Sequence, residues 1–141
     1  MISVEQIRKE LEAFYKSYAA AFNGKDVGAI SKYFASPCAL VTGRGLNQCA
    51  TESDLQHLLG RYLADLKERG WTGSELGQLK IWPMAEDLAM VLADGTRYKA
   101  DGSVLEPVRA CYTVRRDANN WKFVTIAEVH PLFLGPGDLP R

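Results

Sequence analysis

The stretch FYKSYAAAFNGKDVGAISKYFASPCALVTGRG, residues 14–45, contains several changes of local structure in a short length of chain. It begins inside a helix whose expected stop is Asn23-Gly24, a pair that favours the left-handed conformation at a helix C-terminus. Asp26 then caps a second, short helix, which Pro37 prevents from continuing. A buried strand over residues 38–42 follows. The stretch therefore predicts two consecutive helices that lead directly into a sheet.

The flanking sequence predicts two longer helices. Ser3 and Gln6 have the spacing of a capping box at the start of the first one. The helix then shows apolar residues at a 3.6-residue period, which gives it one apolar face: Val4, Ile7, Leu11, Phe14, Tyr15, Tyr18 and Phe22. A third helix is expected to begin at Thr51, with Asp54 at its third position, and to end at Gly70.

After Gly70 the apolar period changes from 3.6 to 2, which is typical of strands. The pattern and its turn residues predict four strands in an antiparallel meander, at 75–84, 87–99, 104–116 and 121–130. No linker or repeat divides the chain, so one domain is expected over residues 1–141. The predicted class is α+β, with three N-terminal helices packed on a curved, mostly antiparallel sheet.

The composition excludes several kinds of partner. Seventeen Lys and Arg balance seventeen Asp and Glu, so no net charge attracts nucleic acid or an anionic membrane. The basic residues at the strand ends, Arg97, Lys99, Arg115, Arg116 and Lys122, are expected to be solvated. The N-terminus has no signal-peptide pattern and no segment has 18 uncharged apolar residues, which predicts a cytoplasmic protein without membrane contact.

The cysteines and histidines predict no metal or cofactor. Three cysteines, Cys38, Cys49 and Cys111, form no CxxC motif and are odd in number, so neither a disulfide framework nor a zinc site is expected. They are interpreted as small buried hydrophobic residues. Only two histidines are present, and His57 belongs to the polar side of its helix. A two-histidine metal site is therefore not expected.

The last predicted strand has apolar residues on both of its faces. Simple alternation places Trp121 and Phe123 on one face and Val124 and Ile126 on the other. Because three helices cover only one face of a sheet, the second apolar face predicts another covering surface, most simply a second copy of the chain. We therefore expect a homodimer through the outer face of the sheet.

The best-defined motif is Tyr18-Ala-Ala-Ala-Phe-Asn-Gly-Lys-Asp26 with Ile30 and Phe34, together with a closing strand that contains Trp121-Lys122-Phe123. In these features, and in the order of its elements over residues 3–130, the chain resembles the nuclear transport factor 2-like superfamily. That superfamily is a cystatin-like α+β cone that includes ketosteroid isomerases, scytalone dehydratase and SnoaL-like cyclases. The resemblance implies an apolar pocket between the first helix and the curved sheet, suited to a small apolar or amphipathic molecule.

The resemblance also implies site residues. Tyr18 matches the oxyanion-binding tyrosine of the isomerases, but the position of their catalytic carboxylate holds Thr42, which cannot accept a carbon-bound proton near neutral pH. The position of their second oxyanion donor holds Arg109. A steroid-type isomerase is therefore not expected, and a core tyrosine bonded to a neighbour is the favoured interpretation of Tyr18. Four large or aromatic residues complete the predicted pocket: Phe14, Tyr62, Trp82 and Met90.

Two further polar groups have alternative interpretations. Arg109 is expected to point into the cavity, where its charge needs either Glu106 or Glu128, or the carboxylate or phosphate of a ligand. Glu128 and His130 stand two apart on one strand face and are candidates for an acid–base pair. Without a bulge in that strand, they share the outer face with Val124 and Ile126 and belong to the dimer interface.

These observations leave three functions open. The leading hypothesis is a small-molecule-binding protein with an apolar pocket that contains Tyr18 and Arg109. The second is a SnoaL-like cyclase, isomerase or dehydratase that acts on a carbonyl compound with Tyr18 and either Glu128 or His130. The third is a protein-interaction module without a ligand, which a cavity filled by its own side chains would favour.

Overall fold

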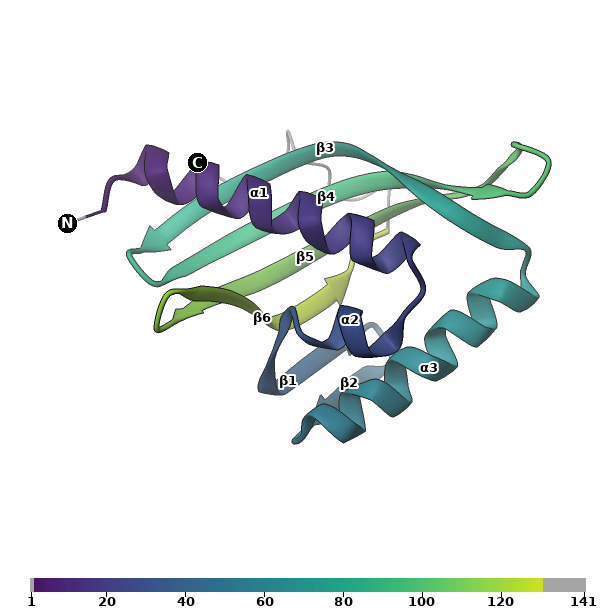
Figure 1. Ribbon diagram of the computed structural model, residues 1–141, viewed down its shortest axis with the longest axis horizontal. Helices are drawn as coiled ribbons and strands as arrows, with labels where there is room; N and C mark the ends of the chain where they lie inside the picture. Colours follow the sequence, from purple (N-terminus) through teal and green to yellow (C-terminus); the bar gives the residue numbers. More distant parts are fainter. Residues whose placement is uncertain (1, 131–141) are drawn as a thin grey trace.

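A computed structural model describes residues 2–130, so both ends of the predicted 1–141 domain lie outside the described residues. Three helices lie on one face of a six-stranded sheet (Figure 1), which confirms the predicted α+β class. The helices are α1 (Val4–Asn23), α2 (Val27–Ser31) and α3 (Glu52–Glu68). The strands are β1 (Phe34–Thr42), β2 (Gly45–Cys49), β3 (Trp71–Ala85), β4 (Leu88–Lys99), β5 (Val104–Asp117) and β6 (Asn120–Glu128).

Side-chain caps start all three helices at the predicted residues. The Ser3 hydroxyl accepts a hydrogen bond from the backbone of Gln6, although the Gln6 side chain donates to Glu10 and does not complete the expected capping box. Asp26 accepts from two backbone N–H groups at the start of α2. Thr51 and its third-position aspartate form the full reciprocal capping box of α3.

The end of α1 differs from the sequence prediction. Gly24 has φ −72° and remains in the right-handed region, and Lys25 takes the left-handed conformation with φ 64°. Asn23 has a different role from the expected stop signal. Its amide group donates to the Ser74 carbonyl and accepts from the Ser74 N–H, both at 2.9 Å. These two hydrogen bonds fasten the C-terminal end of α1 to β3.

The strands have the order β2-β1-β6-β5-β4-β3. All neighbours are antiparallel except β1 and β6, which are parallel. The predicted meander β3–β6 is present, but β2 was not predicted. All of its residues except Cys49 are exposed, so its sequence GLNQC lacks the apolar alternation by which a half-buried strand is found. β1 also begins at Phe34, four residues before the predicted start at Cys38.

A bulge in β6 reverses the side-chain alternation of that strand. Thr113 of β5 pairs with Thr125, whereas the next residue, Val114, pairs with Phe123, so Val124 is an extra residue in β6. Ile126, which pairs with Tyr112, therefore faces the helices together with Phe123. The prediction that Ile126 shares the outer face with Val124 is wrong for this reason.

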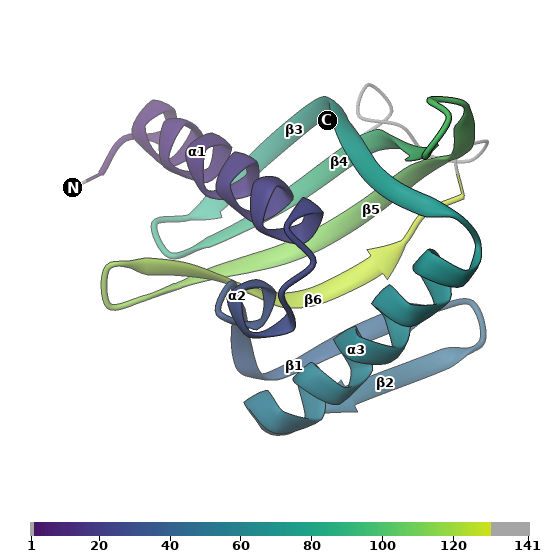
Figure 2. The same ribbon diagram turned by 45° about the vertical axis from the view of Figure 1, so that its right-hand side comes forward.

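The core lies between α1 and the concave face of the sheet. Figure 2 shows α1 crossing β3, β4 and β5, while α3 runs along the same face over β1 and β2. Phe123 is fully buried at the centre of this layer, with its ring 4.7 Å from that of Tyr18 and 4.5 Å from that of Tyr112. Among the described residues, no helix has the length and apolar character needed to cross a membrane.

Candidate functional site

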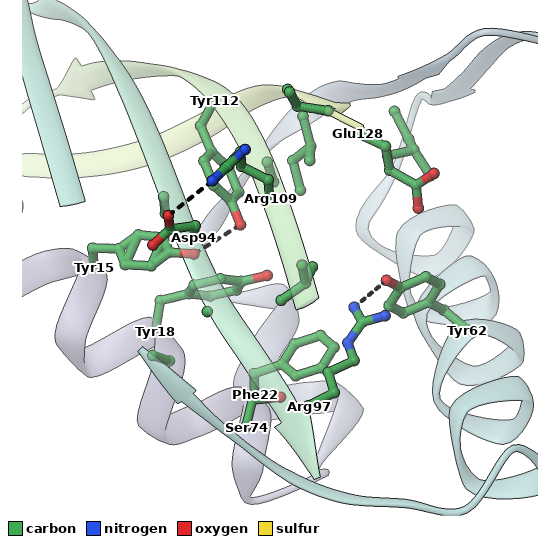
Figure 3. A pocket seen from close by; sticks show the side chains of 18 of the residues that line it. Tyr15, Tyr18, Phe22, Tyr62, Ser74, Asp94, Arg97, Arg109, Tyr112 and Glu128 are labelled. Atoms are coloured by element: carbon green, nitrogen blue, oxygen red, sulfur yellow. Dashed lines mark hydrogen bonds and ion pairs between the residues drawn. The ribbon is translucent and has the colours of Figure 1, made fainter. Parts of the chain in front are cut away.

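A cavity of about 500 Å³ lies between α1, α3 and the sheet (Figure 3). This volume is within the range of small-molecule binding sites, which is about 300–1,000 Å³. Its walls are mostly apolar and come from both long helices and from several strands: Phe22, Phe34, Leu40, Leu55, Leu58, Leu59, Leu76 and Ile126. The space between helices and sheet is therefore not filled by the protein's own side chains.

Three tyrosine hydroxyl groups meet at one end of this cavity. The hydroxyls of Tyr15 and Tyr112 are hydrogen-bonded at 3.0 Å, and the ring of Tyr18 lies edge-on to both of theirs. Figure 3 shows the Tyr18 hydroxyl directed away from α1 into the cavity. The helix period places Tyr15 and Tyr18 on one face of α1, and the register of β5 places Tyr112 opposite them.

Burial fixes the protonation state of these tyrosines. Removal from water raises the pKa of Tyr15 to about 12, although the hydrogen bond to Tyr112 acts in the opposite direction. Burial also raises the pKa values of Tyr18 and Tyr112 well above the ordinary value of 10. All three are therefore neutral at physiological pH. They can donate hydrogen bonds to a carbonyl or developing oxyanion, but they cannot serve as bases.

A buried arginine borders the cavity where α3 meets β4. Arg97 is only 8% exposed and donates to the Glu106 carboxylate at 2.6 Å and to the Tyr62 hydroxyl at 2.5 Å. Arg69, at the end of α3, donates to both oxygens of the same carboxylate at 3.0 and 2.9 Å. These arginines hold the pKa of Glu106 down at about 2. The prediction that Arg97 is solvated is wrong, because its register position opposite Glu106 faces the helices.

Arg109 also borders the cavity, but it is paired within the protein. Its guanidinium lies 3.4 Å from the carboxylate of Asp94, its direct neighbour on β4, and Asp94 accepts a hydrogen bond from the backbone of Gln78. The partner differs from both predicted carboxylates, Glu106 and Glu128.

Glu128 and His130 border the cavity. Glu128 pairs with Ala110 of β5 and, after the bulge, belongs to the helix-facing side of β6. Figure 3 shows its side chain at the cavity, on the side of Tyr62. The placement of these two residues on the outer face, which assumed a strand without a bulge, is therefore wrong.

The other predicted pocket residues do not line the cavity. Phe14 packs between the rings of Tyr33 and Phe123, and the Thr42 hydroxyl accepts a hydrogen bond from the backbone of Arg44 in the hairpin turn. Trp82 and Met90 are paired across β3 and β4. The helix-facing Val91 follows Met90 directly, so alternation places this pair on the outer face of the sheet.

Two of the three cysteines line the cavity as a pair. Cys38 and Cys49 are opposite each other in the β1–β2 hairpin and are buried, and burial raises the pKa of the Cys38 thiol to about 11. Such thiols are poor nucleophiles near neutral pH. Within residues 2–130, no group of three His, Cys, Asp or Glu side chains is placed to hold a metal ion.

Sequence reasoning missed Tyr15, Tyr112 and Arg97 as site residues. Tyr15 carried a usable signal, because it shares the apolar helix face with Tyr18, and two buried hydroxyls three residues apart can act on one group. Tyr112 was missed because Arg109, three residues earlier on the same strand, was expected to point into the cavity, which by alternation directs Tyr112 to the other face. Nothing local distinguished Arg97 from the other basic residues of the sheet, because its partners come from β5 and α3.

Comparison with known protein families gives a match over most of the chain. The family model described as NTF2-like protein (DUF6841) matches residues 8–131. A search of curated proteins gave no match.

Solved structures with the same fold cover most of the chain. A protein of unknown function with a cystatin-like fold from Nostoc punctiforme has a TM-score of 0.71 and 16% identity, with 92% of this chain and 95% of that chain covered. An NTF2-like protein from Novosphingobium aromaticivorans has a TM-score of 0.68 and 15% identity, with 91% and 90% covered. A ketosteroid isomerase-like protein from Erwinia carotovora atroseptica has a TM-score of 0.57 and 20% identity, with 85% and 94% covered.

Proposed function

Because the chain belongs to the NTF2-like protein family DUF6841, we propose that it binds a small amphipathic molecule in the cavity between α1 and the sheet. The observation that carries this proposal is a cavity of about 500 Å³ with apolar walls and three neutral tyrosine hydroxyls at one end. Binding sites for small molecules commonly combine an apolar lining with a few convergent polar groups.

The tyrosine end defines which part of the ligand it recognises. Tyr15 and Tyr112 are hydrogen-bonded to each other, and the Tyr18 hydroxyl points into the open space. A neutral phenol in a site shielded from water is a good hydrogen-bond donor to a carbonyl or phenolate oxygen. The ligand therefore has an apolar body and an oxygen acceptor that lies against Tyr18.

Two measurements test this proposal. Native mass spectrometry of the purified protein is expected to detect a retained small molecule. Calorimetric titration with 2-acetylnaphthalene, a flat apolar ketone, is expected to show binding that Tyr18→Phe weakens about five- to tenfold, the effect of one neutral hydrogen bond. Tyr33→Phe is the matched control, because Tyr33 packs against Tyr18 and bonds to Ser17 but does not line the cavity. Equal effects of the two variants, or no binding at all, would contradict the proposal.

A second candidate is an enzyme that acts on a carbonyl compound. It is favoured by one observation, that Glu128 and His130 border the same cavity as the tyrosines. Either group could remove a proton next to a carbonyl while Tyr18 donates a hydrogen bond to the oxygen on which charge develops. A relative of the same fold is described as ketosteroid isomerase-like, although this chain has Thr42 at the position expected for the base of those enzymes.

Hydrogen exchange separates the two candidates. If the protein catalyses enolisation, it should exchange the methyl protons of 2-acetylnaphthalene with deuterium oxide faster than buffer alone, as followed by NMR. Glu128→Gln or His130→Asn would abolish this exchange, depending on which residue is the base, while binding of the ketone would persist. If the ketone binds but the protein does not accelerate its exchange, the enzymatic function is excluded and only the binding function remains.

A further inference from the structure

Arg97 has more hydrogen-bond donors than its protein partners use. A guanidinium group has five N–H donors, and the described contacts of Arg97 engage one with Glu106 and one with Tyr62. The residue is only 8% exposed, so bulk water reaches little of it. Because Arg97 borders the cavity, its remaining N–H donors are available to a group inside that space.

Arg97 is the most buried of the charged side chains that pair at this end of the cavity, with a side chain 10% exposed against 30% for Glu106 and 40% for Arg69. Two guanidinium groups, from Arg69 and Arg97, share the single carboxylate of Glu106. Asp65 approaches only Arg69 and is 63% exposed, so solvent weakens its effect. Glu75 and Glu128, which also border the cavity, are exposed to solvent as well. The least solvent-screened charge at this end of the cavity is therefore the positive charge of Arg97.

The guanidinium is also held in one position. Its centre lies 5.5 Å from the ring centroid of Tyr62, over the face of the ring, and Glu106 is itself fixed by two hydrogen bonds from Arg69. A fixed planar group loses little freedom on binding and suits the planar geometry of a carboxylate. Arg109, which also borders the cavity, instead lies beside the carboxylate of Asp94.

We propose that Arg97 binds the carboxylate of the ligand, so that the natural ligand is an amphipathic organic acid rather than a neutral compound. This inference rests on the proposed function of the cavity. The apolar body of the acid lies between α1, α3 and the sheet. Any carbonyl or hydroxyl at its other end faces Tyr18 and its two neighbouring tyrosines.

The test compares two probes of nearly equal shape, 2-naphthoate and 2-acetylnaphthalene, which differ by a carboxylate oxygen in place of a methyl group. In calorimetric titrations at pH 7.5, the wild-type protein is expected to bind the acid about tenfold more tightly than the ketone. Arg97→Met is expected to reduce this preference to less than about twofold, while affinity for the ketone changes little. Arg97→Lys, which keeps the charge, is expected to retain part of the preference.

Arg109→Met is the matched control, since it removes a second arginine that borders the cavity. It should leave the preference for the acid intact. A preference that disappears in Arg109→Met and persists in Arg97→Met would overturn the assignment. If the ketone binds and the acid shows no advantage, the inference fails while the binding function stands, whereas binding of neither probe contradicts both. Thermal unfolding of each variant shows that it is folded, and Arg97→Lys takes the place of Arg97→Met if the methionine variant is not.

Discussion

Glu106 connects a helix and two strands through a single carboxylate. It lies on β5, and it accepts hydrogen bonds from Arg69 at the end of α3 and from Arg97 on β4. The two arginines stabilise the ionised form, which is why the pKa of Glu106 falls from 4.5 to about 2. A carboxylate whose pKa is lowered by folding stabilises the folded state only while it is ionised.

This pKa predicts a defined dependence of stability on pH. The contribution of Glu106 is fully present above pH 4.5, the pKa of the unfolded state, and is lost as the pH falls toward 2. Glu106→Gln should therefore lower the free energy of unfolding at pH 7 by about 2 kcal/mol, a typical value for hydrogen bonds to a charged group. The difference between variant and wild type should shrink below pH 4.5. Urea denaturation at pH 7, 4 and 2.5 measures both effects.

Glu12→Gln is the control for that experiment. Glu12 forms an exposed pair with Lys16 one turn away on α1, and such pairs contribute about 0.3–0.5 kcal/mol. If Glu106→Gln lowered the free energy of unfolding at pH 7 by no more than Glu12→Gln does, the ion pairs of Glu106 with the two arginines would not stabilise the fold.

At the level of the elements, β3 and β4 approach each other unusually closely at Gly95. A Cβ atom at this position would lie 2.7 Å from the Glu75 carbonyl oxygen, which belongs to the backbone and cannot move freely. The pairing of the two strands also shifts register just beyond this point, between Leu76 and Leu79. The absence of a side chain at Gly95 therefore allows the two strands to approach this closely beside the cavity.

Gly95→Ala is accordingly expected to destabilise the protein by about 1–3 kcal/mol, because the backbone must shift to relieve the contact. Gly73→Ala, on the same strand pair, is the matched control, since a Cβ there meets nothing within 4 Å. It should be neutral or slightly stabilising. Thermal unfolding of the two variants gives the comparison, and similar melting temperatures would contradict the expectation.

The helices could be predicted well from the sequence because their signals are local. Apolar period, N-terminal caps and the Gly70 stop all lie within a few residues of the ends that they define. The meander was predictable for the same reason. By contrast, nothing in residues 120–128 marks Val124 as an extra residue, because a bulge is a property of the pairing between two strands. That single unpredicted residue decided on which face Ile126 and Glu128 lie.

The residues of the candidate site also differ in whether a local sequence signal identifies them. Tyr18 could be identified from the apolar face of its helix and from the surrounding motif. Arg97 could not, because its environment depends on Glu106, Arg69 and Tyr62, which only the tertiary structure brings together.

At the level of the whole molecule, the homodimer through the outer sheet face stays a prediction. One of its two original supports, Ile126, faces the cavity instead. Alternation places Trp82 and Met90 on the outer face, however, which gives this surface large apolar side chains. Large apolar side chains on the outer face of a sheet favour contact with a second copy.

Light scattering at micromolar concentration is expected to give twice the mass of the chain. Met90→Lys should shift the protein toward the monomer, because it places a charge within the predicted interface. Val4→Lys is the control, since Val4 is 56% exposed on α1, away from that face. A monomeric wild-type protein would remove the prediction.

The strand order has a consequence for how the chain acquires its shape during synthesis. β6 lies between β1 and β5, so the early hairpin of β1 and β2 can join the rest of the sheet only after the last described strand has been made. Until residue 128 leaves the ribosome, the leucines and aromatic residues of the cavity have no complete enclosure. Such pairing between segments far apart in sequence is slow, and partly folded chains with exposed apolar surface tend to aggregate. The nascent chain is therefore most in need of chaperones just before β6 emerges from the ribosome.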